Sequence, residues 1–176
     1  MKEPVYPGVA VGYRQWWVDD HGLLMSYAFG DHAWHPGANR ACCRETKYEK
    51  HVVPSPYCKC GFYAWHALDY FPHSPGKLSQ MSSALYLSGV IAARGNLRVH
   101  YHGFRAPEAQ ILALCCLPDQ DRWDQLAHEV AERYQVPLLA SFEELEKYGR
   151  LFGTPPDLSI RPQSQRLKPA PDSLVG

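Results

Sequence analysis

The sequence contains no long apolar run and no excess of charge of one sign. No stretch of its 176 residues approaches the ~20 apolar residues that a membrane-spanning helix needs. The N-terminus carries an early acid and two prolines and lacks the apolar run of a secretory signal. We therefore expect a protein without membrane partners, in the cytoplasm, where thiols stay reduced. The formal net charge is +0, so composition does not demand a nucleic-acid partner, although a local basic face is compatible with the sequence.

Several motifs of known chemistry are also missing. The sequence has no Gly-rich phosphate loop, no G-x-S-x-G elbow, no H-E-x-x-H helix and no internal repeat. A Cys/His nucleophile pairing remains open, because such partners need not be close in sequence. The sequence evidence for an enzyme is therefore thin, and the question stays undecided at this stage.

Hydrophobic patterning predicts a sheet in the first two thirds of the chain. The composition, with 45% hydrophobic and 20% charged residues, is that of a globular domain. Residues 12–27 alternate around an Asp-Asp-His-Gly step and predict a β-hairpin, and the aromatic run 62–70 predicts a short strand or helix. Residues 84–93, a turn at 94–96, a strand at 97–102 and a third strand at about 109–117 predict an antiparallel meander with one wet, basic face.

The last third of the chain predicts helices and a tail. Residues 122–134 carry apolar side chains at helical spacing with acids opposite. Ser141 and Glu144 fit a capping box, which predicts a second helix to about Leu151 with Gly153 as its stop. Residues 71–83 predict an exposed connection, and residues 154–176 predict a flexible Pro-rich tail.

A cysteine/histidine cluster is the most informative feature of the sequence. Residues 30–57 show no sustained period, and a loop of this length in a compact domain needs something to organise it. Four metal-ligand residues fall close together there and at its end, namely Cys43, His51, Cys58 and Cys60. Four such ligands satisfy tetrahedral Zn²⁺. In a straight strand the last two thiols would point to opposite faces, so a shared metal requires a turn, which Gly61 can supply.

Other interpretations of the cysteines stay open. The cluster spacing differs from paired C-x2-C knuckles, and plain burial or a disulfide would also account for it. An iron–sulfur cluster takes four thiolates and would require Cys42 as well. We expect Cys115 and Cys116, inside an apolar strand, to be buried as small hydrophobes. His32 and His35 form a weaker alternative metal pair.

The same segment resembles one found in small uncharacterised proteins of actinobacteria and their phages. Their pattern is W-x-P-G-x-N-x-A-x-C, then His, then C-x-C-G-x-Y-A. The matching residues are Trp34, Pro36, Gly37, Asn39, Ala41, Cys43, His51, Cys58, Cys60, Gly61, Tyr63 and Ala64. The resemblance covers about half of the chain and implies no function, but it favours Cys43 over Cys42 as the metal ligand.

A second group of residues is basic and aromatic. Arg98, His100 and His102 share one face of a predicted strand, and Arg105 follows. These residues would suit an anion, a phosphate or general-base chemistry, whereas the plainer interpretation is a solvated sheet face. The aromatics suffice for a cage or a base-stacking platform, although most such residues are core. These aromatics are Trp16, Trp17, Trp34, Tyr63 and Trp65.

The expected fold is α+β, with a single domain over residues 1–153. It combines an antiparallel sheet, a metal-stapled N-terminal loop and two C-terminal helices. The expected function is that of a zinc-stabilised, non-enzymatic binding or regulatory module whose partner is a nucleic acid or a protein. Its predicted contact residues are Arg98, His100, His102, Arg105 and Trp34. The alternative is a small enzyme that acts on a phosphate- or nucleotide-containing substrate through the same His/Arg face.

Overall fold

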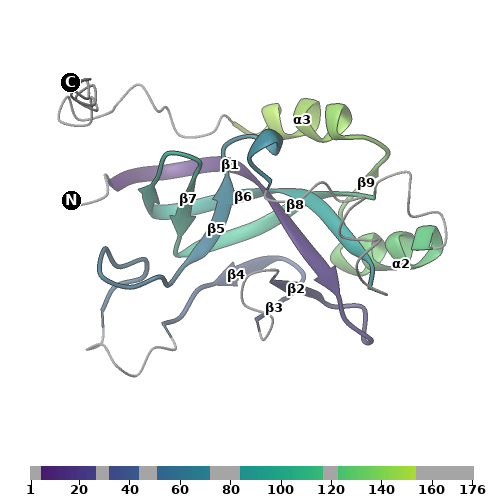
Figure 1. The fold of residues 1–176 in the computed structure, drawn as a ribbon, viewed down its shortest axis with the longest axis horizontal. Helices are drawn as coiled ribbons and strands as arrows, with labels where there is room; N and C mark the ends of the chain where they lie inside the picture. Colours follow the sequence, from purple (N-terminus) through teal and green to yellow (C-terminus); the bar gives the residue numbers. More distant parts are fainter. Residues whose placement is uncertain (1–4, 27–31, 44–50, 72–83, 117–122, 154–176) are drawn as a thin grey trace, which may run out of the picture.

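The computed structural model describes residues 5–26, 32–43, 51–71, 84–116 and 123–153. They form a sheet-rich α+β fold with two helices, as the sequence predicts (Figure 1). The elements are β1 (Val5–Val18), β2 (Leu24–Ser26), β3 (Ala33–Trp34), β4 (Ala38–Arg40), β5 (Phe62–Trp65), the 3-10 helix η1 (Leu68–Tyr70), β6 (Tyr86–Val99), β7 (Gly103–Ala106), β8 (Glu108–Cys115), α2 (Asp124–Tyr134), β9 (Leu138–Leu139) and α3 (Phe142–Arg150). The predicted connection at 71–83 lies almost wholly outside the described residues, and the predicted tail lies wholly outside them.

The predicted N-terminal hairpin is confirmed. β1 pairs with β2 in antiparallel register from Trp16↔Ser26 to Val18↔Leu24. The carboxylate of Asp19 closes the turn by accepting hydrogen bonds from the backbone N–H groups of His21 (3.0 Å) and Leu23 (2.7 Å). An aspartate that bonds the backbone just after it favours a turn over a continued strand.

The predicted turn at residues 94–96 is wrong, because β6 runs straight through it. β1 and β6 pair along their whole length, and Gly8 lies opposite Gly95. Both glycines have positive φ, 136° and 96°, so the two strands deform together instead of separating. The chain reverses later, where the N–H of His100 donates to the carbonyl of Gly103 at 2.7 Å. Gly95, which looks like a turn residue in the sequence, thus lies within a strand because it pairs with Gly8, which is far away in the chain.

Four of the strands close on themselves. β6 pairs with β7, β7 with β5, and β5 returns to β1 through the Tyr13–Trp65 pair, while β1 and β6 are already partners. β8 pairs with β6 along the edge that β7 also uses, and β4 pairs with β8 and continues the sheet. Phe104 is fully buried and its ring lies against Gly12 and Ala64. The closed ring of strands is therefore filled by the Phe104 side chain, which fits because the residue facing it, Gly12, has no side chain.

The two C-terminal helices pack on the sheet away from residues 51–61 (Figure 1). α2 buries Ala127, Val130 and Tyr134 in the main core, and α3 buries Leu145 in a second cluster with Val11. Between them, β9 adds to β8 as a parallel strand. No helix in the described ranges is long and apolar enough to cross a bilayer.

The predicted capping interaction at α3 is present with one shift. The Ser141 hydroxyl accepts from the N–H of Glu144 at 3.2 Å. The Glu144 carboxylate accepts a hydrogen bond from the N–H of Ala140 (3.0 Å), one residue before Ser141, whose N–H is the predicted donor. Both bonds satisfy backbone donors that the start of a helix leaves unpaired.

The contact between Gly12 and Phe104 gives a direct test of the closed ring. A Cβ at position 12 would lie 2.7 Å from Phe104 Cε1. We expect Gly12→Ala to lower the free energy of unfolding by about 1–3 kcal/mol through overpacking. The same change in a Phe104→Leu background should cost less, because the smaller side chain relieves the clash. Chemical denaturation of the four proteins measures this, and an equal cost in both backgrounds would contradict the packing described.

Candidate metal centre

The four predicted metal ligands lie together in the structure. Cys43 follows β4, while His51, Cys58 and Cys60 come from the segment that leads into β5. Their ligand atoms all lie within 4.8 Å of one another. The Sγ atoms of Cys43 and Cys58 are 3.5 Å apart, and His51 Nε2 is 3.2 Å from the Sγ of Cys60. The cluster can therefore hold a metal ion.

The donor set fits a small tetrahedral cation. Three sulfurs and one imidazole nitrogen are soft or borderline ligands. A tetrahedral ion with a metal–sulfur bond of about 2.3 Å places its ligand atoms about 3.5–3.8 Å apart. Two separations in the cluster, 3.5 Å between Cys43 and Cys58 Sγ and 3.2 Å between His51 Nε2 and Cys60 Sγ, lie near that range. Small side-chain shifts would complete the geometry.

Gly61 turns the chain just after the last two thiols and before β5. Its φ is +109°, which side-chain-bearing residues rarely adopt. A Cβ there would also lie 3.1 Å from both the Ala106 carbonyl oxygen and Pro54 Cβ. Before it, the N–H of Cys58 donates to the Ser55 carbonyl at 3.4 Å, which makes a turn ahead of the ligands. The unusual backbone angles predicted for this glycine are confirmed.

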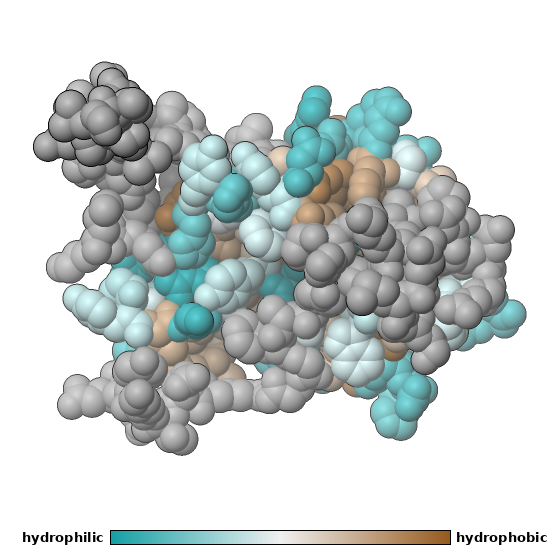
Figure 2. Space-filling model, in the orientation of Figure 1, coloured by the Kyte–Doolittle hydropathy of each residue, from teal (hydrophilic) through white to brown (hydrophobic). Residues whose placement is uncertain are grey.

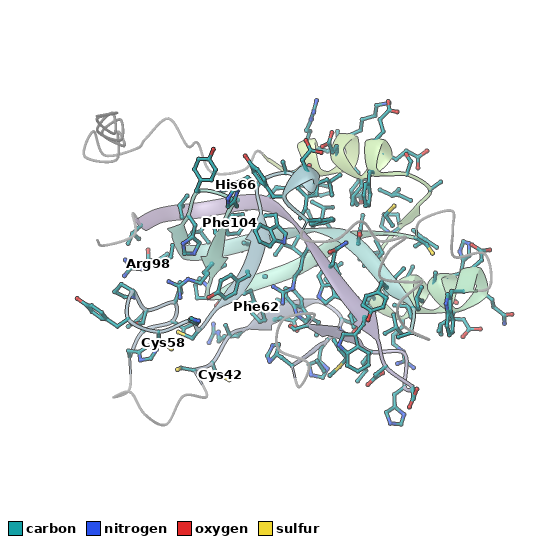
Figure 3. The ribbon with its side chains drawn as sticks, in the orientation of Figure 1. Cys42, Cys58, Phe62, His66, Arg98 and Phe104 are labelled. Atoms are coloured by element: carbon teal, nitrogen blue, oxygen red, sulfur yellow. The ribbon has the colours of Figure 1, made fainter. Side chains whose placement is uncertain are left out.

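Two arginines from the sheet hold the ligand-bearing loop. Arg105, from β7, is 3% exposed, and its Nη1 donates to the carbonyl oxygens of Cys58 and, at 3.3 Å, Cys60. Its Nε donates to Nε2 of His100 at 3.2 Å. Arg98, from β6, donates to the Pro54 carbonyl at 3.4 Å, and Figure 3 shows its side chain at the same end of the molecule as Cys58. Arg98 and Arg105 thus contact the backbone around the ligands.

The electrostatics of the site favour a bound cation. Burial raises the pKa of the Cys60 thiol to about 11, and the neighbouring sulfur of Cys58 adds to the rise. The Cys60 thiol therefore stays protonated at neutral pH unless a cation compensates the charge of its thiolate. A divalent ion with three thiolates carries one excess negative charge, which the guanidinium of Arg105 is placed to offset.

The predicted binding residues do not share one surface. Trp34 is 0% exposed, and its indole N–H donates to Ser26 Oγ at 3.2 Å, so it belongs to the core. Arg105 is buried as well. His100 and His102 lie in the turn after β6 instead of on the strand, and only His102 of these two is exposed. The prediction of a single strand face is therefore wrong.

The other aromatic side chains divide between core and surface layers. Trp16 is also fully buried and meets Trp34 edge to face, with ring centroids 5.4 Å apart. Trp17, Tyr63 and Trp65 are half-buried. The core interpretation of the aromatics is thus confirmed for the two buried tryptophans, and a cage built around Trp34 is excluded.

The remaining candidate ligands lie apart from the cluster. Cys42 is exposed and is outside the group of four, so an iron–sulfur site with four thiolates lacks its fourth ligand. Cys115 is buried as predicted, and burial raises the pKa of its thiol to about 12. In the described ranges neither His32 nor His35 joins a metal-ligand group.

Two buried polar residues were missed by sequence reasoning. Arg14 points into the core from β1, where it donates to the Tyr63 carbonyl and to Ser26 Oγ (2.8 Å) and lies 4.9 Å from the Trp34 ring. Burial lowers its pKa to about 10. His66 is buried beside Phe104, bonds the His100 carbonyl at 3.0 Å, and has its pKa lowered by burial. The available signal was a charged residue at an inward position of an apolar strand.

Arg105 and Arg40 offer a matched pair for testing the anchoring role. Arg105→Met should lower the free energy of unfolding by about 2–3 kcal/mol, because buried carbonyls lose a charged donor. Arg40 makes an exposed ion pair with Glu108 (2.7 Å), so Arg40→Met should change it by no more than about 1 kcal/mol.

Hydrogen exchange should localise the Arg105→Met effect to residues 51–61, with faster exchange there than in the Arg40→Met protein. Equal stability and equal exchange in the two variants would contradict the anchoring role.

Comparison of the chain with known proteins found no match. No protein-family model, no curated protein and no solved structure matches it. The resemblance to actinobacterial and phage proteins stays a prediction. Functional argument therefore rests on the geometry of the Cys43, His51, Cys58 and Cys60 cluster and its surroundings.

Proposed function

We propose that Cys43, His51, Cys58 and Cys60 bind one structural Zn²⁺ and that the protein is a zinc-stabilised, non-enzymatic binding or regulatory module. The observation that carries this proposal is the convergence of four protein ligands within 4.8 Å. Four protein ligands fill a tetrahedral ion and leave no position for a substrate or a water, which is the pattern of a structural site. The thiols must stay reduced, which the cytoplasm provides.

The loop itself supports a structural role for the ion. Residues 51–61 contain no strand or helix, and two of their larger apolar side chains, Val52 and Tyr57, are exposed. Burial of apolar surface therefore contributes less here than in the sheet. A metal at the base of the loop, together with the Arg98 and Arg105 contacts, would supply the missing stabilisation.

The contacts of His100 and Arg105 favour a binding module over the enzyme alternative. A general base needs a free ring nitrogen, but Nε2 of His100 accepts a hydrogen bond from Arg105. The guanidinium of Arg105 is also buried and directed at loop carbonyls, so it is poorly placed for a substrate phosphate. The partner would be a nucleic acid or a protein.

The metal content of the purified protein tests the zinc site on which the proposal rests. Protein purified without added metal should contain about one equivalent of zinc by elemental analysis, because the site is built from four ligands. His51→Ala and Cys58→Ser should each lose the metal and lower the midpoint of thermal unfolding. Substitution with Co²⁺ should give the intense visible absorption of a tetrahedral thiolate site.

Cysteines outside the cluster serve as controls. Cys42→Ser and Cys115→Ser should keep the full equivalent of zinc, because neither residue lies in the group of four. Less than about half an equivalent of any metal in the unmodified protein would refute the proposal. Loss of zinc in Cys42→Ser with retention in Cys58→Ser would refute the ligand assignment.

A further inference from the structure

Two tyrosines are exposed at the end of the molecule that carries the metal centre. Tyr57, in the ligand-bearing loop, is 74% exposed, and Tyr101, in the turn between β6 and β7, is 59% exposed. The ring of Tyr101 stands edge-on to His102, with centroids 4.5 Å apart, and His102 in turn meets Tyr70 at 4.7 Å. An exposed tyrosine offers a flat apolar face, and flat faces suit stacking against other rings.

Side-chain contacts link the loop to the turn. Arg105 bonds the Cys58 carbonyl on the loop side and His100 on the turn side. Tyr63 also bridges the two, because its hydroxyl donates to the Lys59 carbonyl at 3.0 Å and its ring stacks on His100 with an interplanar angle of 3°. Figure 2 shows teal and pale side chains at this end, with some brown, hydrophobic ones between them. The relative position of the loop and turn tyrosines is therefore fixed by several contacts.

This end carries two accessible basic side chains, Lys59 and Arg98, although the whole chain is neutral. Arg105 is buried against the loop, Arg94 lies opposite Glu108 in the β6–β8 register, and among the described residues from 51 to 107 the acid is Asp69. Most of the exposed acids of the described residues lie instead on the two helices away from this end (Figure 1). Those acids include Asp124, Glu129, Glu132, Glu143 and Glu144. Most of the exposed acidic charge thus lies away from the metal end, where Lys59 and Arg98 can face a polyanion.

We propose that this surface binds single-stranded nucleic acid. We call it the metal-end surface, and it consists of Tyr57, Lys59, Arg98, Tyr101 and His102. Unpaired bases stack on the two tyrosines, and the phosphates between them lie against the basic side chains. The proposal rests on the proposed zinc centre, because the ion holds the loop that carries Tyr57 and Lys59.

Single strands fit this surface better than a duplex. Reading a duplex requires an element that enters a groove, and the helices lie away from this end with exposed acids on them. In a duplex the bases are stacked on one another and their faces are closed to side chains. A single strand presents those faces to exposed aromatic rings without requiring sequence-specific hydrogen bonds.

Fluorescence anisotropy with labelled 20-nucleotide dT and rU strands tests the proposal on the zinc-loaded protein. Affinity should fall as salt rises, since counterions are released from the phosphates. Tyr57→Ala and Tyr101→Ala should each weaken binding by about 5–150-fold, the range measured for losing one base–aromatic stack. Lys59→Gln should weaken binding and reduce the salt dependence.

The α3 end of the chain provides matched controls. Phe152→Ala removes an aromatic ring of similar exposure, and Lys147→Gln removes an exposed charge on α3. Neither should change the affinity, and a 20-base-pair duplex should bind more weakly than the single strands. Tyr57→Ala and Tyr101→Ala should keep their zinc, which shows that the centre is intact in these variants.

Three outcomes would overturn the metal-end surface while leaving the zinc centre standing. These are zinc-loaded protein that binds no strand, binding that survives both tyrosine substitutions, and equal or tighter binding of the duplex. Competition by poly-glutamate with no effect of the tyrosine substitutions would identify an acidic protein partner instead. Absence of zinc refutes the proposed function itself, and strand binding by metal-free protein refutes the link between the two.

Discussion

The buried guanidinium of Arg105 is the contact on which the metal end of the molecule depends. Burying an arginine is costly unless its donors are satisfied. Here the donors meet the Cys58 and Cys60 carbonyls and the ring of His100, three groups from two separate segments. One side chain therefore determines where the ligand loop and the β6–β7 turn lie relative to β7. It also brings a positive charge to a site where three thiolates would leave a negative excess.

Close backbone approach makes this arrangement possible. A Cβ on Gly103 would lie 2.0 Å from the Ala64 carbonyl oxygen, so β5 and β7 approach each other there at glycine distance. Gly12 allows the Phe104 ring to fill the space between β1 and β5, and Gly61 turns the chain from the loop into β5. The closed ring of strands is thus a stiff base, and the loop is attached to it through hydrogen bonds and, as proposed, a metal.

Local signals predicted local features well, and long-range pairing defeated them. The Asp19 turn, the capping at Ser141 and the four ligands are each visible within a short stretch of sequence. The β6 strand was divided at Arg94-Gly95-Asn96 because nothing nearby reveals that Gly8 pairs with Gly95. The positions of Arg105 and Trp34 were misjudged for a similar reason, since a polar or aromatic side chain shows its burial only once distant partners are known.

The exposure of Tyr57 also follows from the way in which the loop at residues 51–61 is attached to the sheet. A segment held by apolar burial must turn its large side chains inward, whereas a segment held by metal ligands and backbone hydrogen bonds need not. Residues 51–61 use cysteine, histidine and carbonyl groups for attachment, which leaves Val52 and Tyr57 exposed. In the proposed function, a metal site whose four ligand positions are all filled by protein would in this way support a surface that is open to a partner.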